Sequence, residues 1–466
     1  MYRELQPLRQ ALAEKVRASL PSLPGVEPDK LLATYLDRLT MYVGLDVAEA
    51  TFTALALDAG REVLASLTKC SNRQSGFERF QTWVTELQTQ ANLPLVVVAA
   101  ETSGVYYWAL WDYLAQHTAF ARVLFNPRTT QHMGEVLSVK VRDDLVDALL
   151  IAEQLRLGST PEVKLCEDAD LLSARLCSRA ARDLATQINR KKCQLHAFLR
   201  AYSPAIQLTF PRAKLHHPAV VALLKQYLFA DEFIAAGEET LTQFLTEHCR
   251  SALGQAEAQA LIAHSRQVIN RPIQREVFRQ RIHDLLDDIQ RLKQQQSFFL
   301  TTGYQLIKQR PETALLRAVP GAGVSNTLAL ISELADVSRF PNGAHLASFL
   351  GLTTSKHISG TTLYKTKRIT KHGSPNARYA LVNMAEFLRR HVPRYQQMYQ
   401  SIRNRKPPRK GHFIALVAIA RDFVTNILYD MFTQHRPFFL EVEDYRQYRQ
   451  QQASPPPEPI EPSGNN

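Results

Sequence analysis

An unbroken apolar run, LPLVVVAAE at residues 93–101, does most to limit the folds that this chain can adopt. A strand of this composition is normally covered on both faces, as in a sheet with helices on each side. Three strand-like runs joined by short turns begin at Met41, and SGFERFQTWVTELQTQA, at residues 75–91, has helical periodicity between them and the apolar run. Further segments of helical periodicity follow the apolar run. The pattern predicts an α/β domain over residues 40–160, in which three antiparallel strands and then helix-linked parallel strands form one mixed sheet.

The rest of the chain is predicted to be mainly helical. Residues 161–310 form a helical linker with two long helices, and the apolar stripe from Phe278 to Leu292 makes the second helix a coiled-coil candidate. Packing of that helix on its own domain explains the stripe equally well. Residues 311–437 are predicted to form a mainly helical C-terminal domain. Residues 1–39 are predicted to be a helical extension, and residues 438–466 a Pro-rich tail that is disordered from about residue 450.

The charge of the chain points to a polyanionic partner. The 466 residues carry a formal net charge of +12, and nucleic acid is the leading candidate, with a basic protein that has no such role as the alternative. Five scattered cysteines, none in a CxxC pair, argue against a zinc site and suit a reducing cytoplasm. No apolar run is long enough to span a bilayer, and the N-terminus lacks the apolar core of a signal peptide. We therefore expect a cytoplasmic protein without a membrane partner.

Two acidic residues end strands of the expected sheet. Asp46 ends the apolar part of the first strand, and Glu101 ends the apolar run. Asp144 and Asp147 share one face of an expected helix, and so would Asp143 and Asp147. Each signal alone has an ordinary explanation, as a turn residue or a solvated face. Together, four such carboxylates can hold two Mg²⁺ ions through oxygen ligands, an arrangement that cleaves phosphodiesters: Asp46, Glu101, Asp144 and Asp147.

The C-terminal domain concentrates the positive charge. Between Leu352 and His412 the chain has fourteen Lys or Arg and one acid, as expected of a surface that neutralises phosphates. The turn Pro320–Gly323 places glycine N–H groups at a helix start, as in a helix-hairpin-helix element, although such turns are also common in loops. Ser359 lies in the basic stretch, but spacing alone does not favour it over Ser355 or Ser374. The expected nucleic-acid-binding residues are Gly321, Gly323, Lys356, Lys365, Lys367, Arg368, Lys371 and Arg378.

Several of these motifs occur together in one known family. The Asp46 strand, AAETSGVYYWAL around Glu101, FNP at 125–127 and VKVRDDLVDALLIAE resemble the RuvC-like domain of the DEDD insertion-sequence transposases. This group contains the Piv-type invertases and the bridge-RNA-guided recombinases. Pro-Gly-x-Gly, Phe, Gly-Leu and Ser359-Gly360 resemble the C-terminal transposase domain of the same family. The family pattern Lys-Thr-Asp-x-x-Asp reads Arg-Asp-Asp-Leu-Val-Asp from Arg142 here, which aligns Asp144 rather than Asp143 with the metal-binding pair.

The resemblance implies an RNase H-like fold and a DNA strand-exchange activity. In the family, the serine aligned with Ser359 is a covalent nucleophile that works with a metal-binding acid tetrad. The resemblance also implies a homo-oligomer (dimer or tetramer), DNA partners at the element ends and the target, a structured guide RNA, and a nucleoid-associated location in a bacterium or archaeon. Three alternatives stay open: a Holliday-junction-type metal-dependent endonuclease, a site-specific DNA invertase, and a DNA-binding regulator with an inactive site.

Overall fold

The computed structural model contains two compact units, residues 1–165 and residues 166–466, and each is considered by itself. The residues described are 36–139, 141–158, 168–212, 214–249, 253–269, 274–359, 362–371 and 373–439. The helical extension expected at 1–39 lies almost wholly outside them. The tail expected at 438–466 lies outside them from residue 440 onwards.

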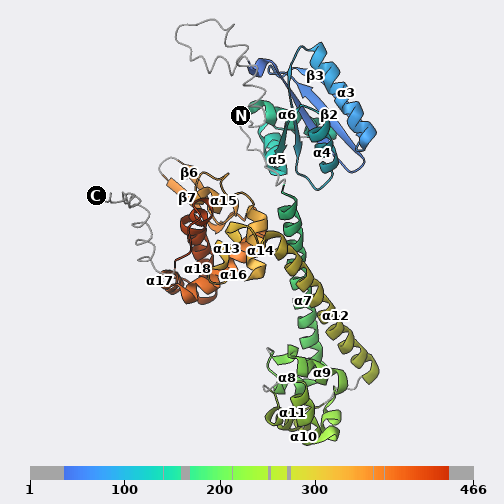
Figure 1. The fold of residues 1–466 in the computed structure, drawn as a ribbon, viewed down its shortest axis with the longest axis vertical. Coiled ribbons are helices and arrows are strands. Elements are labelled where there is room, and N and C mark those ends of the chain that lie inside the picture. The colour runs from blue at the N-terminus through green and yellow to red at the C-terminus, as the bar shows by residue number, and fades with distance from the viewer. Residues whose placement is uncertain are drawn as a thin grey trace, which may run out of the picture. The chain divides into compact units, whose positions relative to one another are not determined.

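The first unit is built on a five-stranded mixed sheet (Figure 1). The strand order is β3-β2-β1-β4-β5, with antiparallel pairing of β1 with β2 and of β2 with β3, and parallel pairing of β1 with β4 and of β4 with β5. The predicted mixed sheet is confirmed, and its order is consistent with an RNase H-like arrangement. The strands are β1 (Thr40–Val47), β2 (Thr51–Leu57), β3 (Val63–Ser71), β4 (Leu95–Glu101) and β5 (Ala121–Phe125).

Helices cover both faces of this sheet. One face packs against α3 (Gln74–Gln90) and α4 (Trp108–His117), and the other packs against α6 (Asp144–Leu157). β4 contributes to both cores, because Val98 lies in the first and Ala99 in the second. This double burial is what its unbroken apolar composition predicts. A further helix that was not expected from the sequence, α5 (Pro127–Val136), follows β5.

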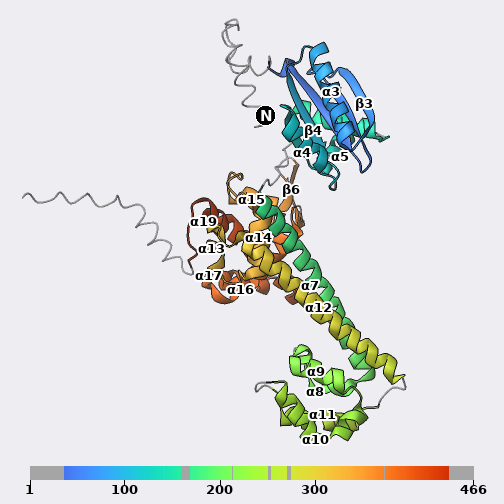
Figure 2. The ribbon, with the colours of Figure 1, turned by 45° about the vertical axis from the view of Figure 1, so that its right-hand side comes forward.

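The second unit is organised around two long helices, α7 (Ala169–Tyr202) and α12 (Arg275–Ile307), which lie side by side (Figure 2). At one end, Leu199 and Phe278 lie in a core shared with the shorter helices of the central region. At the other end, Leu171 and Ile307 lie in the C-terminal core. The apolar stripe of α12 is therefore buried within this chain. The shorter helices are α8 (Pro204–Thr209), η2 (Lys214–His216), α9 (Pro218–Gln226), α10 (Ala230–Glu247) and α11 (Gln255–Gln267).

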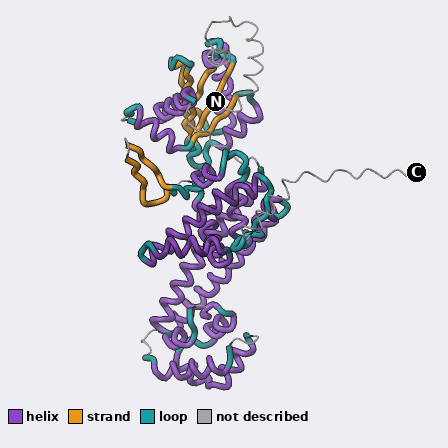
Figure 3. Tube along the Cα trace, turned by 90° about the vertical axis from the view of Figure 1, so that its left-hand side faces the viewer, coloured by secondary structure: helices purple, strands orange, loops and turns teal. Residues whose placement is uncertain are grey.

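The C-terminal part of this unit is mainly helical, as predicted, with one strand hairpin that was not expected. Strands β6 (Thr354–Ser359) and β7 (Thr362–Ile369) pair antiparallel and form a two-stranded sheet of their own (Figure 3). The helices are α13 (Pro311–Arg317), α14 (Val324–Leu334), α15 (Gly343–Phe349), α16 (Pro375–His391), α17 (Pro393–Asn404), α18 (Pro408–Phe423) and α19 (Tyr429–Thr433), with a π-helical turn, Val424–Leu428, before α19.

One helical stretch of the described residues, Lys410–Thr433, is long and apolar enough to cross a membrane by length and composition alone. This corrects the expectation that the chain has no such run. Leu416, Ile419 and Phe423 of the stretch are buried in the C-terminal core. Core helices pass the same test, so this burial accounts for the apolar composition of the stretch.

Candidate active site

Asp46 and Glu101 lie side by side at the carboxyl ends of two parallel strands. Leu45 of β1 pairs with Ala100 of β4, so the next position along each strand is an acidic residue. Alternate residues of a strand share a face, and Ala99, two residues before Glu101, lies in the core under α6. Glu101 therefore lies on the face of the sheet that α6 covers.

Gly44 sets the distance between β1 and α6. A Cβ atom at Gly44 would lie 2.1 Å from the carbonyl oxygen of Ala148 and 2.5 Å from the amide nitrogen of Ala152. Only glycine allows two backbones to approach this closely. Asp46 lies two residues after Gly44 on the same face, and Asp147 directly precedes Ala148. The contact thus brings the first turn of α6 to the strand ends that carry the acids.

The neighbouring aspartates at the start of α6 have different roles. Asp143 is the N-cap residue, and its Oδ1 accepts a 2.8 Å hydrogen bond from the N–H of Val146. Asp144 and Asp147 lie inside the first turn of the helix, on one face. The cap accounts for Asp143 and leaves Asp144 and Asp147 as the pair that can act together.

Neighbouring carboxylates help to raise the pKa of three of the four acids. Burial, together with the negative charges of Asp147, Asp144 and Glu101, raises the pKa of Asp46 to about 6. Burial also raises the pKa of Glu101 and the pKa of Asp147, and neighbouring carboxylates add to both effects. The structure therefore gathers the four predicted acids into one cluster in which negative charge exceeds positive charge.

Two residues not expected from the sequence belong to this cluster. Nη1 of Arg142 lies 3.9 Å from Oδ1 of Asp147, and its positive charge opposes the rise in the pKa of Asp147 and of Glu101. The buried Thr130 hydroxyl, beside Glu101, also acts to lower the pKa of that carboxyl. A signal for Arg142 was present in the sequence, because it takes the place of the lysine in the family pattern.

The chemistry of the cluster fits a hard divalent cation. Its donors are carboxylate oxygens, and Oδ1 of Asp147 is buried without a hydrogen-bond partner. Within the described part of the chain, no three His, Cys, Asp or Glu side chains are arranged so that they could hold a metal ion as they stand. Side-chain movements would have to bring the carboxylates together, and a cation would offset the burial and the negative charges that raise the pKa of Asp46.

Ser359 lies in the second unit, at the end of β6, and the following Gly360 lies outside the described residues. In the same hairpin, Lys356 is paired in register with Lys365. β7 also carries Lys367 and Arg368.

Ser374, one of the serines that spacing leaves open, has a structural role. Its Oγ accepts hydrogen bonds of 3.2 Å from the N–H groups of Asn376 and Ala377, and it caps α16. The proline after it stands at the first helical position, where proline is favoured. Ser374 and the proline after it therefore form a helix start. Ser355 and Ser359 both lie on β6.

Arg378 and Lys371 lie near the base of the β6–β7 hairpin. Nη1 of Arg378 donates hydrogen bonds to the carbonyl oxygens of Leu350, at 3.0 Å, and Gly373, at 3.2 Å. The guanidinium thus joins the segments that lead into and out of the hairpin. Lys371 is exposed, and its backbone N–H donates to the carbonyl of Gly351 at 3.2 Å.

The glycines of the turn before α14 differ in role. Gly321 has a φ of +86°, and a Cβ there would lie 2.8 Å from Cβ of Phe387, so conformation and packing both require glycine. Gly323 is the exposed N-cap residue of α14, and a Cβ there would meet nothing within 4 Å. Gly323 is thus the better placed of the two to bring backbone N–H groups to a phosphate.

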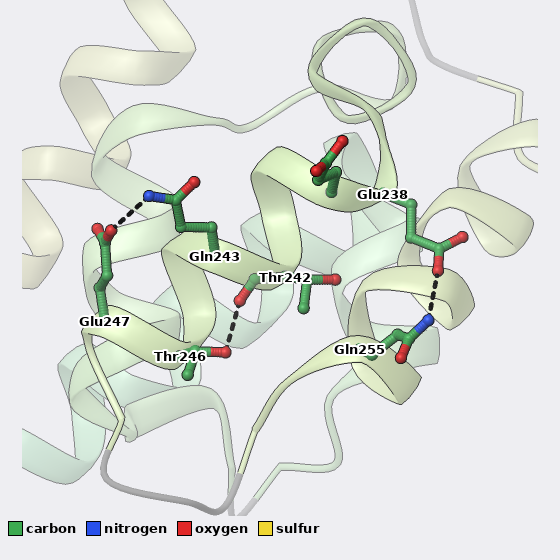
Figure 4. A pocket seen from close by; sticks show the side chains of 7 residues that line it. Glu238, Thr242, Gln243, Thr246, Glu247 and Gln255 are labelled. Atoms are coloured by element: carbon green, nitrogen blue, oxygen red, sulfur yellow. Dashed lines mark hydrogen bonds between the residues drawn. The ribbon is translucent and has the colours of Figure 1, made fainter.

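A pocket of the central helical region does not suit a phosphate (Figure 4). Its volume is about 570 Å³, and it contains none of the predicted site residues. Gln255 donates to Glu238 at 3.1 Å, and Gln243 donates to Glu247 at 2.8 Å, so its polar side chains pair among themselves. The lining residues are Glu238, Glu239, Thr242, Gln243, Thr246, Glu247 and Gln255.

Two family models match the two parts of the chain that carry the predicted site residues. Residues 43–204 match the IS110-type DEDD transposase domain, and residues 313–400 match a model described as the transposase IS116/IS110/IS902 family. Over these two ranges, the chain is similar to this transposase family. Residues 205–312 lie outside both matches, and they contain nearly all of the shorter central helices and the whole of α12.

Curated relatives include invertases and insertion-element proteins. The pilin gene-inverting protein of Moraxella bovis is 31% identical over 139 residues, which are 29% of this chain and 42% of that protein. An uncharacterized insertion element IS110 protein of Streptomyces coelicolor is 23% identical over 63% of this chain and 72% of its own length. An IS116 protein of Streptomyces clavuligerus is 24% identical over 71% of this chain and 79% of its own length. The match thus spans less than half of the pilin gene-inverting protein.

Proposed function

We propose that this protein is a DNA transposase or recombinase of an insertion sequence, which cleaves and exchanges strands through a phosphoserine at Ser359. The observation that carries the proposal is the cluster of four acids in a domain that matches the DEDD transposases. The second family domain, with its basic hairpin, supports the role of Ser359. The metal-binding residues proposed are Asp46, Glu101, Asp144 and Asp147.

The proposed reaction conserves phosphodiester bonds. Oγ of Ser359 attacks the scissile phosphorus and loses its proton to a base or to solvent. The bond to O3′ breaks, and the released 3′ oxygen takes up a proton, which leaves a 5′-phosphoserine and a free 3′-hydroxyl. The 3′-hydroxyl of a second strand then attacks the phosphoserine and frees the serine. A divalent cation bound to the four acids would stabilise the charge that develops on the phosphoryl oxygens.

The finer parts of the proposal are Mg²⁺ as the cation, a homo-oligomeric assembly and a structured guide RNA. Their support is the family resemblance. In such a system, base pairing with the RNA selects target and donor, and the protein reads backbone and shape. The concentrated positive charge of residues 352–412 supports a nucleic-acid partner and does not distinguish RNA from DNA.

A covalent-adduct assay tests the proposal. Purified protein is incubated with labelled DNA carrying the element ends, Mg²⁺ and co-purified RNA, and the protein–DNA adduct is mapped by peptide sequencing. We expect one adduct at Ser359, with Ser359→Ala abolishing both the adduct and strand exchange. Ser355→Ala, four residues away on the same strand, is the matched control and should keep both. An adduct mapped to another residue would contradict the proposal.

The alternatives give different results in the same assay. A Holliday-junction-type endonuclease uses water as the nucleophile, so Ser359→Ala would still cleave DNA and no adduct would form. A regulator with an inactive site would cleave nothing, and Asp46→Asn would change nothing. The similarity to the pilin gene-inverting protein favours one variant of the proposal, a site-specific invertase. Such an enzyme would reverse a segment between two sites in place of inserting an element.

A further inference from the structure

The loop between β4 and α4, together with the first residue of α4, exposes a group of large apolar side chains a few residues after Glu101 of the acid cluster. Glu101 ends β4, and within the next seven residues Val105, Tyr106 and Trp108 are 66%, 44% and 48% exposed. The residue between the two aromatic side chains, Tyr107, is 5% exposed and lies in the core of the sheet. The loop thus turns one aromatic ring inward and leaves Tyr106 and Trp108 facing solvent.

This loop is held in place by hydrogen bonds to two other strand ends. Nδ2 of Asn72, which follows β3, donates to the carbonyl of Tyr106 and to the carbonyl of Ala48, which follows β1, both at 2.9 Å. The N–H of Thr102 donates to the carbonyl of Phe125 on β5 at 3.0 Å. The exposed rings therefore stand on an anchored segment, so little conformational entropy is lost when they bind a partner.

Arginines stand at the same edge of the sheet. Arg73 follows Asn72, and Arg128 lies in the first turn of α5, directly after β5; both are exposed. Among the described residues, neither guanidinium forms an ion pair. Exposed aromatic rings next to uncompensated cations are the combination with which proteins bind unpaired nucleotides, because rings stack on bases and cations neutralise phosphates.

We propose that Tyr106 and Trp108 stack on unpaired bases of the DNA strand beside the scissile phosphate. This inference rests on the proposed function, because the acid cluster would hold that phosphate. It goes beyond it by assigning a single-strand binding site to the β4–α4 loop. Stacking would keep the bases next to the cut apart from their complementary strand while the phosphodiester is exchanged.

Equilibrium binding to matched oligonucleotides tests the inference. The full chain is titrated, in EDTA to prevent cleavage, against one labelled sequence as single-stranded DNA, as duplex DNA and as single-stranded RNA. We expect Tyr106→Ala and Trp108→Ala each to weaken single-stranded DNA binding roughly 5- to 100-fold. Duplex binding should change by less than about two-fold, since its bases are not free to stack. Tyr106→Phe keeps the ring and should bind like the unchanged protein.

Tryptophan fluorescence separates stacking from simple charge attraction. The chain has three tryptophans, Trp83, Trp108 and Trp111, and Trp108 is far more exposed than Trp111, at 48% against 6%. Single-stranded DNA should quench the emission of the unchanged protein, and Trp108→Phe should lose most of this quenching while still binding. Equal quenching in Trp108→Phe, or unchanged affinity in both alanine variants, would overturn the inference.

The remaining outcomes separate this inference from the proposed function. A Ser359 adduct together with unchanged DNA binding by the alanine variants would reject the stacking site and leave the recombinase in place. Stacking without any adduct would keep the single-strand binding site and reject the phosphoserine mechanism. A loss of RNA binding alone would assign the loop to an RNA partner and reject the DNA site. Equal loss for duplex and single strands would show that the rings act as general contacts, which also rejects it.

Discussion

Asp46 combines partial burial with three negatively charged neighbours, and this combination is costly without a cation. Taking a carboxylate out of water disfavours its charged form, and the nearby carboxylates add to that effect. Arg142 opposes the rise in pKa only for Glu101 and Asp147. The ionised carboxylates destabilise the folded protein when no cation is bound. A divalent ion would relieve this destabilisation, and the relief would add to the affinity of the cluster for the ion.

Asp46→Asn tests this directly, because it removes one charge at nearly constant volume. The pKa of Asp46 is raised to about 6, so between about pH 4 and pH 6 the folded protein holds this proton more tightly than the unfolded chain does. The destabilisation due to Asp46 therefore grows as the pH rises through that window and stays constant above it. Without metal at about pH 7.5, we expect Asn to raise the melting temperature by roughly 2–4 °C, or about 1 kcal/mol after discounting for solvent screening, with no gain near pH 4.

Metal addition supplies the second half of that experiment. Mg²⁺ or Mn²⁺ should raise the melting temperature of the unchanged protein and should raise that of Asp46→Asn much less, because binding to the folded state stabilises it. Asp112→Asn, on the exposed side of α4, is the matched control and should respond like the unchanged protein. Equal stabilisation of the unchanged protein and Asp46→Asn would contradict the metal site.

At the scale of elements, the contact of β1 with α6 determines where the acids meet. The backbone of α6 passes so close to Gly44 that no side chain fits between them. Helix and strand therefore contribute their carboxylates to the same place without any direct bond between the carboxylates. A larger residue at this position must push α6 away from the sheet.

Gly44→Ala should therefore weaken the first unit and its metal site together. We expect a loss of about 1–3 kcal/mol in the free energy of unfolding, as for overpacked cores. All three tryptophans lie in the first unit, so tryptophan fluorescence during urea unfolding reports on that unit. Gly60→Ala, at an exposed turn where the nearest atoms belong to the Asp58 side chain, is the control and should change stability by no more than about 0.5 kcal/mol. Similar losses in both variants would contradict the role given to Gly44.

Elements defined by local pattern could be predicted from the sequence, and those set by tertiary contacts could not. Apolar runs and helical periodicity gave the sheet, α3, α6 and the long helices. The run GVYYWALWDYLAQH also predicts a helix, but α4 begins only at Trp108, because Gly104 has a φ of +67° and the preceding loop is anchored by Asn72. The alternating pattern of TLYKTKRI is typical of a strand, but the many cations around it indicate a binding surface. The strand hairpin was therefore not predicted. Nothing local marks Gly44 or Thr130 as a neighbour of the acids.

At the scale of the whole molecule, the acids and Ser359 belong to different compact units. The family resemblance implies that the acid cluster of one protomer and Ser359 of another form one active site. Mixing inactive Asp46→Asn with inactive Ser359→Ala should then restore strand exchange, because some pairs combine an intact acid cluster with an intact serine. The measurement is product formation after the two proteins have exchanged subunits. Continued inactivity despite proven subunit exchange would place acids and serine in one protomer and contradict assembly between protomers.

The α7 and α12 pair is buried in two cores at once, the central one through Leu199 and Phe278 and the C-terminal one through Leu171 and Ile307. If the part of α7 and α12 in one core unfolds, the helical turns that continue into the other core are disturbed as well. Substitutions in the shorter helices of the central region would therefore lower the amount of protein in which the C-terminal core is folded. They would do so although they alter no residue proposed to touch DNA. Loss-of-function variants in this region are best read first as folding defects.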